Sequence, residues 1–327
     1  MPVLLGYSTA FQVIRTLGGP IPPSQIVLVP LSQLTYREED LKHARCPWTD
    51  YLSQPFHIMV SPQTKHYQTN TRVLHTSSPF DEGIPAFRLD ENLYCVTPEV
   101  LFAHMACLLN RIALAMVGFE LCGTYRIDGD SLKQRSPVAN TSMLGEFLYA
   151  HNTLRGSQKA LSVLSRIIDG SASPMETACA LGLSLPRSLG GCGLPKPLLN
   201  YEISLSEHAE KILGYPTITP DLYWPEGDIA IEYDSNLHHT GAHRIAQDAR
   251  RRNSMEMDNH QVVTVTNQQL AYAQGLDGIA HIIAKALNKR IRFSSENSWR
   301  EHVKVVPQLY NMAIHHELLL GATDKQR

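Results

Sequence analysis

The amino-acid sequence predicts an α/β protein built from two domains. A chain of 327 residues is longer than most single domains, so two domains, each with its own hydrophobic core, are expected. Between residues 174 and 287 the apolar pattern follows the order helix, three strands, helix, strand, helix, which is typical of α/β domains. A polar, turn-rich stretch at 126–142 separates that region from an earlier one with short strands.

The chain is therefore expected to have four parts. They are a smaller α+β domain at 1–125, a linker at 126–142, an α/β domain at 143–290 and a C-terminal tail at 291–327. Three runs in the first part read as strands because they are short, apolar and bounded by turn residues, at 25–29, 56–60 and 71–75.

A long apolar run then extends from Val100 to Glu120 at helical spacing, too long for one strand. Thr97 is a suitable N-cap, and Pro98 suits the first helical position. The sequence therefore predicts one buried helix here.

The second domain is expected to begin with helical patterns at 143–168. A further helix begins at Pro174, with Ser173 as its cap, so Glu176 lies in its first turn. The remaining elements are an irregular segment at 190–197, a strand at 201–205, a β-hairpin at 221–234, a helix at 242–257, a strand at 261–266 and a helix at 276–287.

Composition excludes several classes of protein. Hydrophobic residues make up 43% and charged residues 18%, and no apolar run reaches the length of roughly 18 residues that spans a bilayer. The N-terminus lacks a basic flank and a cleavage site, so a cytoplasmic protein without a membrane partner is expected. The six cysteines form no CxxC pair, which argues against a structural zinc site and a disulfide framework.

Acidic residues of the hairpin point to a metal site. Asp221 opens the first arm, and Glu232 lies eleven positions later on the second, so an antiparallel turn brings them side by side. Asp234 is two residues further, on the same strand face as Glu232. Such acids repel one another unless a cation or a proton lies between them. His238 follows the strand and is suited to act as a general base on water.

These residues resemble the PD-(D/E)XK nuclease pattern, with Pro220-Asp221, ten intervening residues and then Glu232-Tyr233-Asp234. With the following DARRRN and QVVTVTNQQL segments, residues 155–290 resemble the domains related to very-short-patch repair endonucleases. The resemblance implies a restriction-endonuclease-like mixed sheet flanked by helices. It also implies Mg²⁺ (or Mn²⁺) bound by Asp221, Glu232 and Glu176, with catalysis by Asp221, Glu232, Asp234 and His238 on DNA.

Two positions depart from the family pattern. Asp234 replaces the lysine, which removes the usual cation beside the scissile phosphate. Ser235 stands where related domains commonly have glycine, so the turn after the strand could differ. The alternative is a non-catalytic, antitoxin-like regulator that binds DNA or protein and retains a degenerate nuclease fold.

A basic cluster lies on the helix that follows the hairpin, at Arg244, Arg250, Arg251 and Arg252. Guanidinium groups suit phosphates, so these arginines are expected to hold the DNA backbone. The competing interpretation is that they pair along the helix surface with neighbouring acids, namely Asp248, Glu256 and Asp258. The net charge of −2 provides no global basic field that would decide between them.

The first domain carries a looser resemblance. FHIMVSP, then VLHTS and YCVTPEVLFAHMA, follow the order seen in AbiEi-type antitoxin and regulator proteins. This resemblance implies a regulatory or recognition domain that could bind a protein partner.

Simpler interpretations remain open for the acidic and histidine residues. Asp221 and Glu232 could be a turn residue and a solvated strand residue, because short motif matches arise by chance. Glu176 could merely favour the positive end of its helix. His238, His239 and His243 could suggest zinc, but no cysteine or acid completes a ligand set at ordinary spacing.

Overall fold

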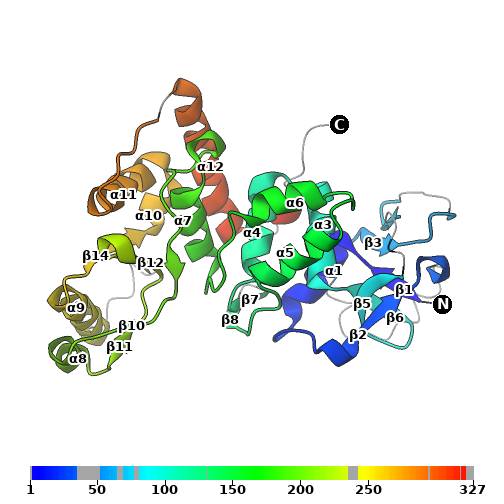
Figure 1. Cartoon of the computed structure of the whole chain (residues 1–327), viewed down its shortest axis with the longest axis horizontal. Coiled ribbons are helices and arrows are strands. Elements are labelled where there is room, and N and C mark those ends of the chain that lie inside the picture. The colour runs from blue at the N-terminus through cyan, green and yellow to red at the C-terminus, as the bar shows by residue number, and fades with distance from the viewer. Residues whose placement is uncertain are drawn as a thin grey trace. The chain divides into compact units, whose positions relative to one another are not determined.

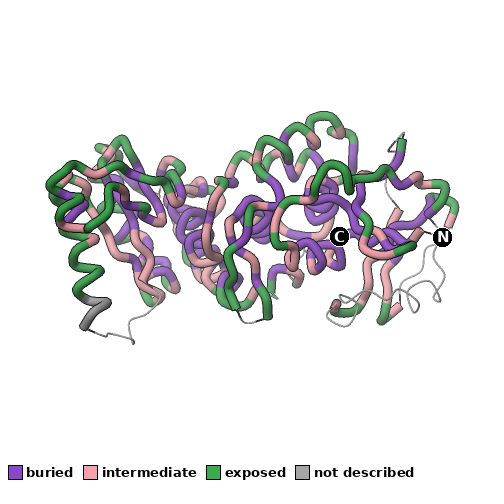
Figure 2. The backbone as a smooth tube through the Cα atoms, turned by 90° about the horizontal axis from the view of Figure 1, so that it is seen from below, coloured by how far each residue is buried: buried purple, intermediate pink, exposed green. Residues whose placement is uncertain are grey.

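A computed structural model of the chain divides into two compact units. Unit 1 comprises Met1–Ile167 and Leu319–Arg327, and unit 2 comprises Ile168–Leu318. The structure describes residues 2–34, 52–64, 69–76, 80, 82–129, 131–234, 242–293, 295–316 and 318–321, and only the backbone of 242–245 and 321. Buried backbone segments lie in the interior of each unit and exposed segments lie outside (Figure 2). The chain is mixed α/β, as predicted.

Unit 1 contains a six-stranded mixed sheet with the strand order β2-β5-β6-β1-β3-β4. Its strands are β1 (Val3–Leu5), β2 (Ile26–Val29), β3 (Phe56–Met59), β4 (Arg72–His75), β5 (Ile84–Arg88) and β6 (Leu93–Val96). β1 pairs with β6 and β3 with β4 in parallel, and the other pairs are antiparallel. The three strands predicted at 25–29, 56–60 and 71–75 are confirmed as β2, β3 and β4.

The helices of unit 1 share its apolar core with the strands. These helices are α1 (Tyr7–Thr16), α3 (Pro98–Leu108), α4 (Arg111–Leu121), α5 (Thr141–Ala150) and α6 (Ser157–Leu164). The single helix predicted from Val100 to Glu120 is wrong, because the structure has two helices there. Asn110 is extended and accepts a hydrogen bond from Ala113 N at 2.9 Å, so it caps α4 and interrupts an otherwise continuous apolar pattern.

The segment expected as a linker at 126–142 belongs to the folded part of unit 1. Its first half forms the antiparallel pair β7 (Tyr125–Asp128) and β8 (Ser131–Gln134), and α5 begins at Thr141. The boundary between the compact units lies later, after Ile167. Polarity alone suggested a linker, but the polar side chains of this segment bind other parts of unit 1.

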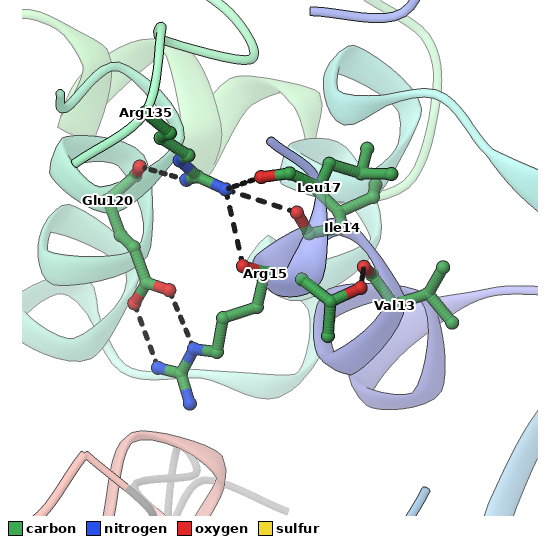
Figure 3. Close-up of polar contacts among 7 residues, drawn as sticks. Val13, Ile14, Arg15, Leu17, Glu120 and Arg135 are labelled. Carbon is green, nitrogen blue, oxygen red and sulfur yellow. Dashed lines mark hydrogen bonds and ion pairs between the residues drawn. The ribbon is translucent and has the colours of Figure 1, made fainter. Parts of the chain in front are cut away.

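Arg135 is the clearest example of such binding (Figure 3). Its side chain is buried, and Nη1 donates to the carbonyl oxygens of Ile14 at 3.1 Å and Leu17 at 3.5 Å, at the end of α1. Nη2 donates to the carbonyl oxygen of Glu120 at 2.7 Å, and the Glu120 carboxylate binds Arg15 at 2.6 Å. Arg135 therefore adds hydrogen bonds to carbonyl groups at the C-terminal ends of α1 and α4, where a helix lacks its regular backbone donors.

Unit 2 is arranged around a four-stranded sheet with the order β14-β13-β12-β9. Its strands are β9 (Leu198–Leu199), β12 (Leu222–Trp224), β13 (Ile229–Asp234) and β14 (Gln261–Thr266). β12 is antiparallel to β9 and β13, whereas β14 is parallel to β13. The parallel pair needs a long crossover, which α9 (Ala242–Met257) provides. The predicted hairpin and the strand at 261–266 are confirmed.

Further helices accompany this sheet (Figure 1). They are α7 (Pro174–Ser184), α8 (Glu207–Leu213), α10 (Asn267–Ala271), α11 (Ala273–Ala286) and α12 (Glu296–Ile314). The short helix α13 (Leu318–Gly321) follows, and from Leu319 onward the chain belongs to unit 1. The strand predicted at 201–205 is shortened to β10 (Ile203–Ser204), which pairs with β11 (Thr217–Ile218) in a separate ribbon. Short 3₁₀ turns occur at Pro23–Gln25, Leu31–Gln33, Arg187–Leu189 and Pro225–Gly227.

The segment expected as a C-terminal tail at 291–327 contains α12, the longest described helix of unit 2. Val305, Val306 and Leu309 are buried on one face, at the spacing of an amphipathic helix. α12 packs against α7, as Figure 1 shows. Among the described residues, no helix is long and apolar enough to cross a bilayer.

Candidate functional site

Glu176 is fixed at the start of α7. The Ser173 hydroxyl accepts a hydrogen bond from Glu176 N at 3.1 Å, and Pro174 occupies the first helical position, as the sequence predicted. Oε2 of Glu176 accepts from Ala172 N at 2.9 Å and from Asn200 Nδ2 at 2.8 Å. The side chain is buried, and burial raises the pKa of Glu176, although these hydrogen bonds oppose the shift.

Asp221 lies immediately before β12, opposite the second arm of the hairpin. The pairing of Leu222 with Ile231, continued by one residue, sets Asp221 across from Glu232. Oδ2 of Asp221 accepts a hydrogen bond from Tyr233 N at 2.6 Å. The predicted juxtaposition of Asp221 and Glu232 therefore follows from the register of the hairpin.

The three carboxylates influence one another electrostatically. Burial, followed by the negative charge of Glu176, raises the pKa of Asp221 to about 7. Glu232 raises the pKa of Asp221 further, whereas the Tyr233 N–H and Arg251 lower it. Asp221 is thus a buried carboxyl group whose pKa lies well above its ordinary value of about 3.9, with two further acids close enough to act on its charge.

Glu232 on β13 is paired with an arginine from the crossover helix. Oε1 of Glu232 accepts from Nη2 of Arg251 at 2.6 Å and from Nε at 3.2 Å. Nη2 also donates to the carbonyl oxygen of Thr219 at 3.2 Å. Both side chains are about one-third exposed, at 31% for Arg251 and 28% for Glu232.

Asn200 is a member of this site that the sequence did not indicate. Its Nδ2 donates to Glu176 and to the carbonyl oxygen of Gly170, while its backbone N–H donates to the carbonyl oxygen of Asp221 at 3.1 Å. It thereby links the start of α7 to the start of β12. Its φ of +47° is in the left-handed region that asparagine tolerates well, and no motif marks such a position in the sequence.

The other arginines of α9 have different surroundings. Arg250 is exposed and donates to the Ala246 carbonyl oxygen of its own helix at 3.4 Å, and Arg252 donates to Thr264 Oγ1 at 3.2 Å. Neither forms an ion pair with another described residue. The side chain of Arg244 lies outside the described residues. The surface pairing with Asp248, Glu256 and Asp258 is thus not observed for these two arginines or for Arg251.

Two predicted catalytic residues lie at or beyond the end of β13. Asp234 is its last residue and is half-buried, and its charge contributes, after burial, to raising the pKa of Tyr233. His238 and His239 lie outside the described residues, as does the side chain of His243.

The arrangement supplies oxygen ligands of the kind that Mg²⁺ or Mn²⁺ binds. Among the described residues, none donates a hydrogen bond to Oδ1 of Asp221 or to Oε2 of Glu232. Each of these two acids therefore keeps one oxygen for a cation. The described part of the chain holds no group of three His, Cys, Asp or Glu side chains already close enough to enclose an ion.

No family model, curated protein sequence or solved structure matches this chain.

Proposed function

We propose that unit 2 is a divalent-metal-dependent nuclease of the PD-(D/E)XK type that hydrolyses DNA phosphodiester bonds. Apart from the inserted segment β10, α8 and β11, the order α7, β9, β12, β13, α9, β14 is a helix, three strands, a helix and a strand, which supports a restriction-endonuclease-like fold. The acids lie on the elements on which the resemblance expects them: Glu176 on the helix before the sheet, and Asp221 and Glu232 on the hairpin.

The observation that carries this proposal is the crowding of negative charge around Asp221. Burial raises the pKa of Asp221 to about 7, and the negative charges of Glu176 and Glu232, which come from separate elements, add to this rise. Such an arrangement costs stability unless a proton or a cation neutralises it. Retaining it is physically reasonable where a divalent ion is to be bound.

Asp221 and Glu232 would hold the ion through their remaining oxygens, and Glu176 would complete the set. A hard cation held by these residues would supply Lewis acidity, lowering the pKa of a bound water molecule and offsetting negative charge on the phosphate. His238 would accept the proton from that water. The exposed Arg250 and Arg252 side chains would hold phosphates of the DNA backbone on either side.

A plasmid-nicking assay tests this function. With Mg²⁺ or Mn²⁺, the full chain is expected to convert supercoiled DNA to the nicked form, and chelation is expected to stop it. Asp221→Asn and Glu232→Gln are each expected to lower the rate by about 100-fold or more, a typical loss when one charge-stabilising group is removed. Both substitutions nearly preserve side-chain shape.

Glu296→Gln is the matched control, because Glu296 is an exposed acid on α12 that pairs with Arg300 away from these residues. It is expected to leave the nicking rate unchanged. Nicking that persists in both site variants, or that needs no divalent ion, would rule out the proposed site.

A non-catalytic regulator that binds DNA or protein is the second candidate. It is favoured by the pairing of Glu232 with Arg251 and by Asp234 at the position of the motif lysine. This candidate predicts DNA binding, measured by fluorescence anisotropy, that is the same with and without divalent ions and leads to no cleavage.

A further inference from the structure

Arg251 is directed at the candidate site by the packing of α9. Met255, four residues later, is fully buried against Tyr223 and Ala230 of the sheet. Residues four apart lie on the same helix face, so the buried Met255 turns Arg251 toward β13. There its guanidinium reaches Glu232.

The guanidinium retains unused hydrogen-bonding capacity. Nε and Nη2 donate to Glu232 and to the Thr219 carbonyl oxygen. Nη1 carries two further N–H groups, for which no acceptor exists among the described residues. Because the side chain is 31% exposed, these donors are accessible to a ligand.

The charge balance of the site explains why such a cation matters. The PD-(D/E)XK pattern has a lysine at position 234, but this chain has Asp234 there. Among the described residues, Arg251 is the cation whose charge acts on Asp221. It reaches the hairpin from the next element along the chain.

We propose that Arg251 supplies the positive charge that this chain lacks at position 234, and that its guanidinium would move from Glu232 to a DNA phosphate when a divalent ion binds Glu232. This inference rests on the proposed nuclease function and adds a catalytic residue to it. Arg251 would contact the phosphate that is cleaved, whereas Arg250 and Arg252 would contact flanking phosphates.

This movement of Arg251 is physically reasonable because its guanidinium and the divalent ion would compete for the Glu232 carboxylate. The Glu232 carboxylate would bind the Arg251 guanidinium less strongly once it also held a divalent ion. A partly exposed ion pair contributes little to stability, so separating it costs little. The freed guanidinium has planar N–H groups that match two oxygens of a phosphate.

The test compares Arg251→Gln and Arg251→Lys in the full chain. Mn²⁺ affinity is measured without DNA by titration calorimetry, and plasmid nicking is measured at saturating Mn²⁺. Arg251→Gln is expected to bind Mn²⁺ more tightly by up to about fivefold, because the competing cation is gone and a partly exposed ion pair is worth up to about 1 kcal/mol. Its nicking rate is nevertheless expected to fall about 100-fold. Arg251→Lys keeps the charge and is expected to recover most of that loss.

Arg300→Gln is the control, because Arg300 forms an ion pair of similar length, 2.7 Å, with Glu296 on the surface of α12. It is expected to change neither Mn²⁺ affinity nor nicking. If Arg251→Gln nicks DNA as fast as the unmodified chain, or if the lysine variant is no better than the glutamine variant, Arg251 is not the catalytic cation.

The two proposals fail in different ways. If Asp221→Asn and Glu232→Gln abolish nicking and Arg251→Gln does not, the nuclease stands and the role of Arg251 falls. If the unmodified chain neither binds Mn²⁺ nor nicks DNA, the proposed function itself falls. Thermal unfolding of each variant shows whether it is folded. If Arg251→Gln is not folded, Arg251→Lys, which keeps the positive charge, is compared with the unmodified chain instead.

Discussion

Among the described residues of unit 1, His57, His75 and His104 gather around Tyr7. The Tyr7 ring stacks on His75 with centroids 3.8 Å apart and on His104 with centroids 4.4 Å apart. Nδ1 of His57 lies 2.8 Å from Nε2 of His75. Burial lowers the pKa of His57 to about 4 and that of His104 to about 3, so both rings are neutral in the folded protein at pH 7.

These histidines make the stability of unit 1 depend on pH. A histidine in an unfolded chain titrates near pH 6.5, so the unfolded state takes up protons first as the pH falls. The stability from the neutral rings is fully present above about pH 6.5. It decreases as the pH falls toward 4 for His57 and toward 3 for His104, by about 1.4 kcal/mol per pH unit for each proton.

His104→Phe removes the contribution of one histidine to this pH dependence, because phenylalanine keeps a ring against Tyr7 but has no titratable nitrogen. Urea unfolding of the full chain between pH 7 and pH 4.5 is expected to show a shallower loss of stability in this variant. His208→Phe, at an exposed position on α8, is expected to retain the original slope. Equal slopes in His104→Phe and the unmodified chain would contradict the buried, neutral state of His104.

At the scale of elements, α12 supports the helix that carries Glu176. Leu309 of α12 is 1% exposed and lies close to Gly182 of α7. Gly190, with a φ of +82°, lets the chain pass directly against Val305 of α12. These contacts keep α7 in place, and α7 in turn holds Glu176 near Asp221.

Leu309→Ala is expected to destabilise unit 2 by about 2–4 kcal/mol, the usual cost of removing a buried leucine side chain. Val303→Ala on the same helix is the control, because Val303 is 42% exposed, and a change within about 0.5 kcal/mol is expected there. Chemical denaturation followed by circular dichroism measures both. If the two variants lose the same small amount, α12 does not form part of the core.

The sequence predicted elements well where local pattern and packing agree. The hairpin at 221–234, α9 and β14 follow directly from their periodicity and turn residues. Prediction failed where a single polar residue overrides an apolar run, as Asn110 does between α3 and α4. Prediction also failed for α12, which was expected to be part of a C-terminal tail. The apolar face of this helix packs against α7, which is distant in the sequence.

At the scale of the whole molecule, the candidate site belongs to unit 2 alone. Its residues come from α7, the segment after β9, the segment before β12, β13 and α9. The sequence predicted that Asp221 lies opposite Glu232 and that Glu176 lies in the first turn of its helix, because strand register and helix capping act locally. It could not predict that Asn200 joins Glu176 to Asp221, or that Arg251 selects Glu232 over the acids of its own helix, since both depend on packing.

The boundary between the units shows the same limitation. The polar stretch at 126–142 resembled a linker, but Arg135 is buried where it binds the ends of α1 and α4. A polar residue can therefore belong to a core when it satisfies carbonyl groups there. The composition of a segment does not reveal which of its polar residues are buried against carbonyl groups in this way.

Direct titration of the full chain with Mn²⁺ tests the central claim most sharply, because it measures binding without requiring catalysis. The account predicts one site per chain, with affinity lowered at least about tenfold by Asp221→Asn and by Glu232→Gln and unchanged by Glu296→Gln. Binding of equal strength in all four proteins, or no binding in any of them, would contradict a metal site formed by Glu176, Asp221 and Glu232.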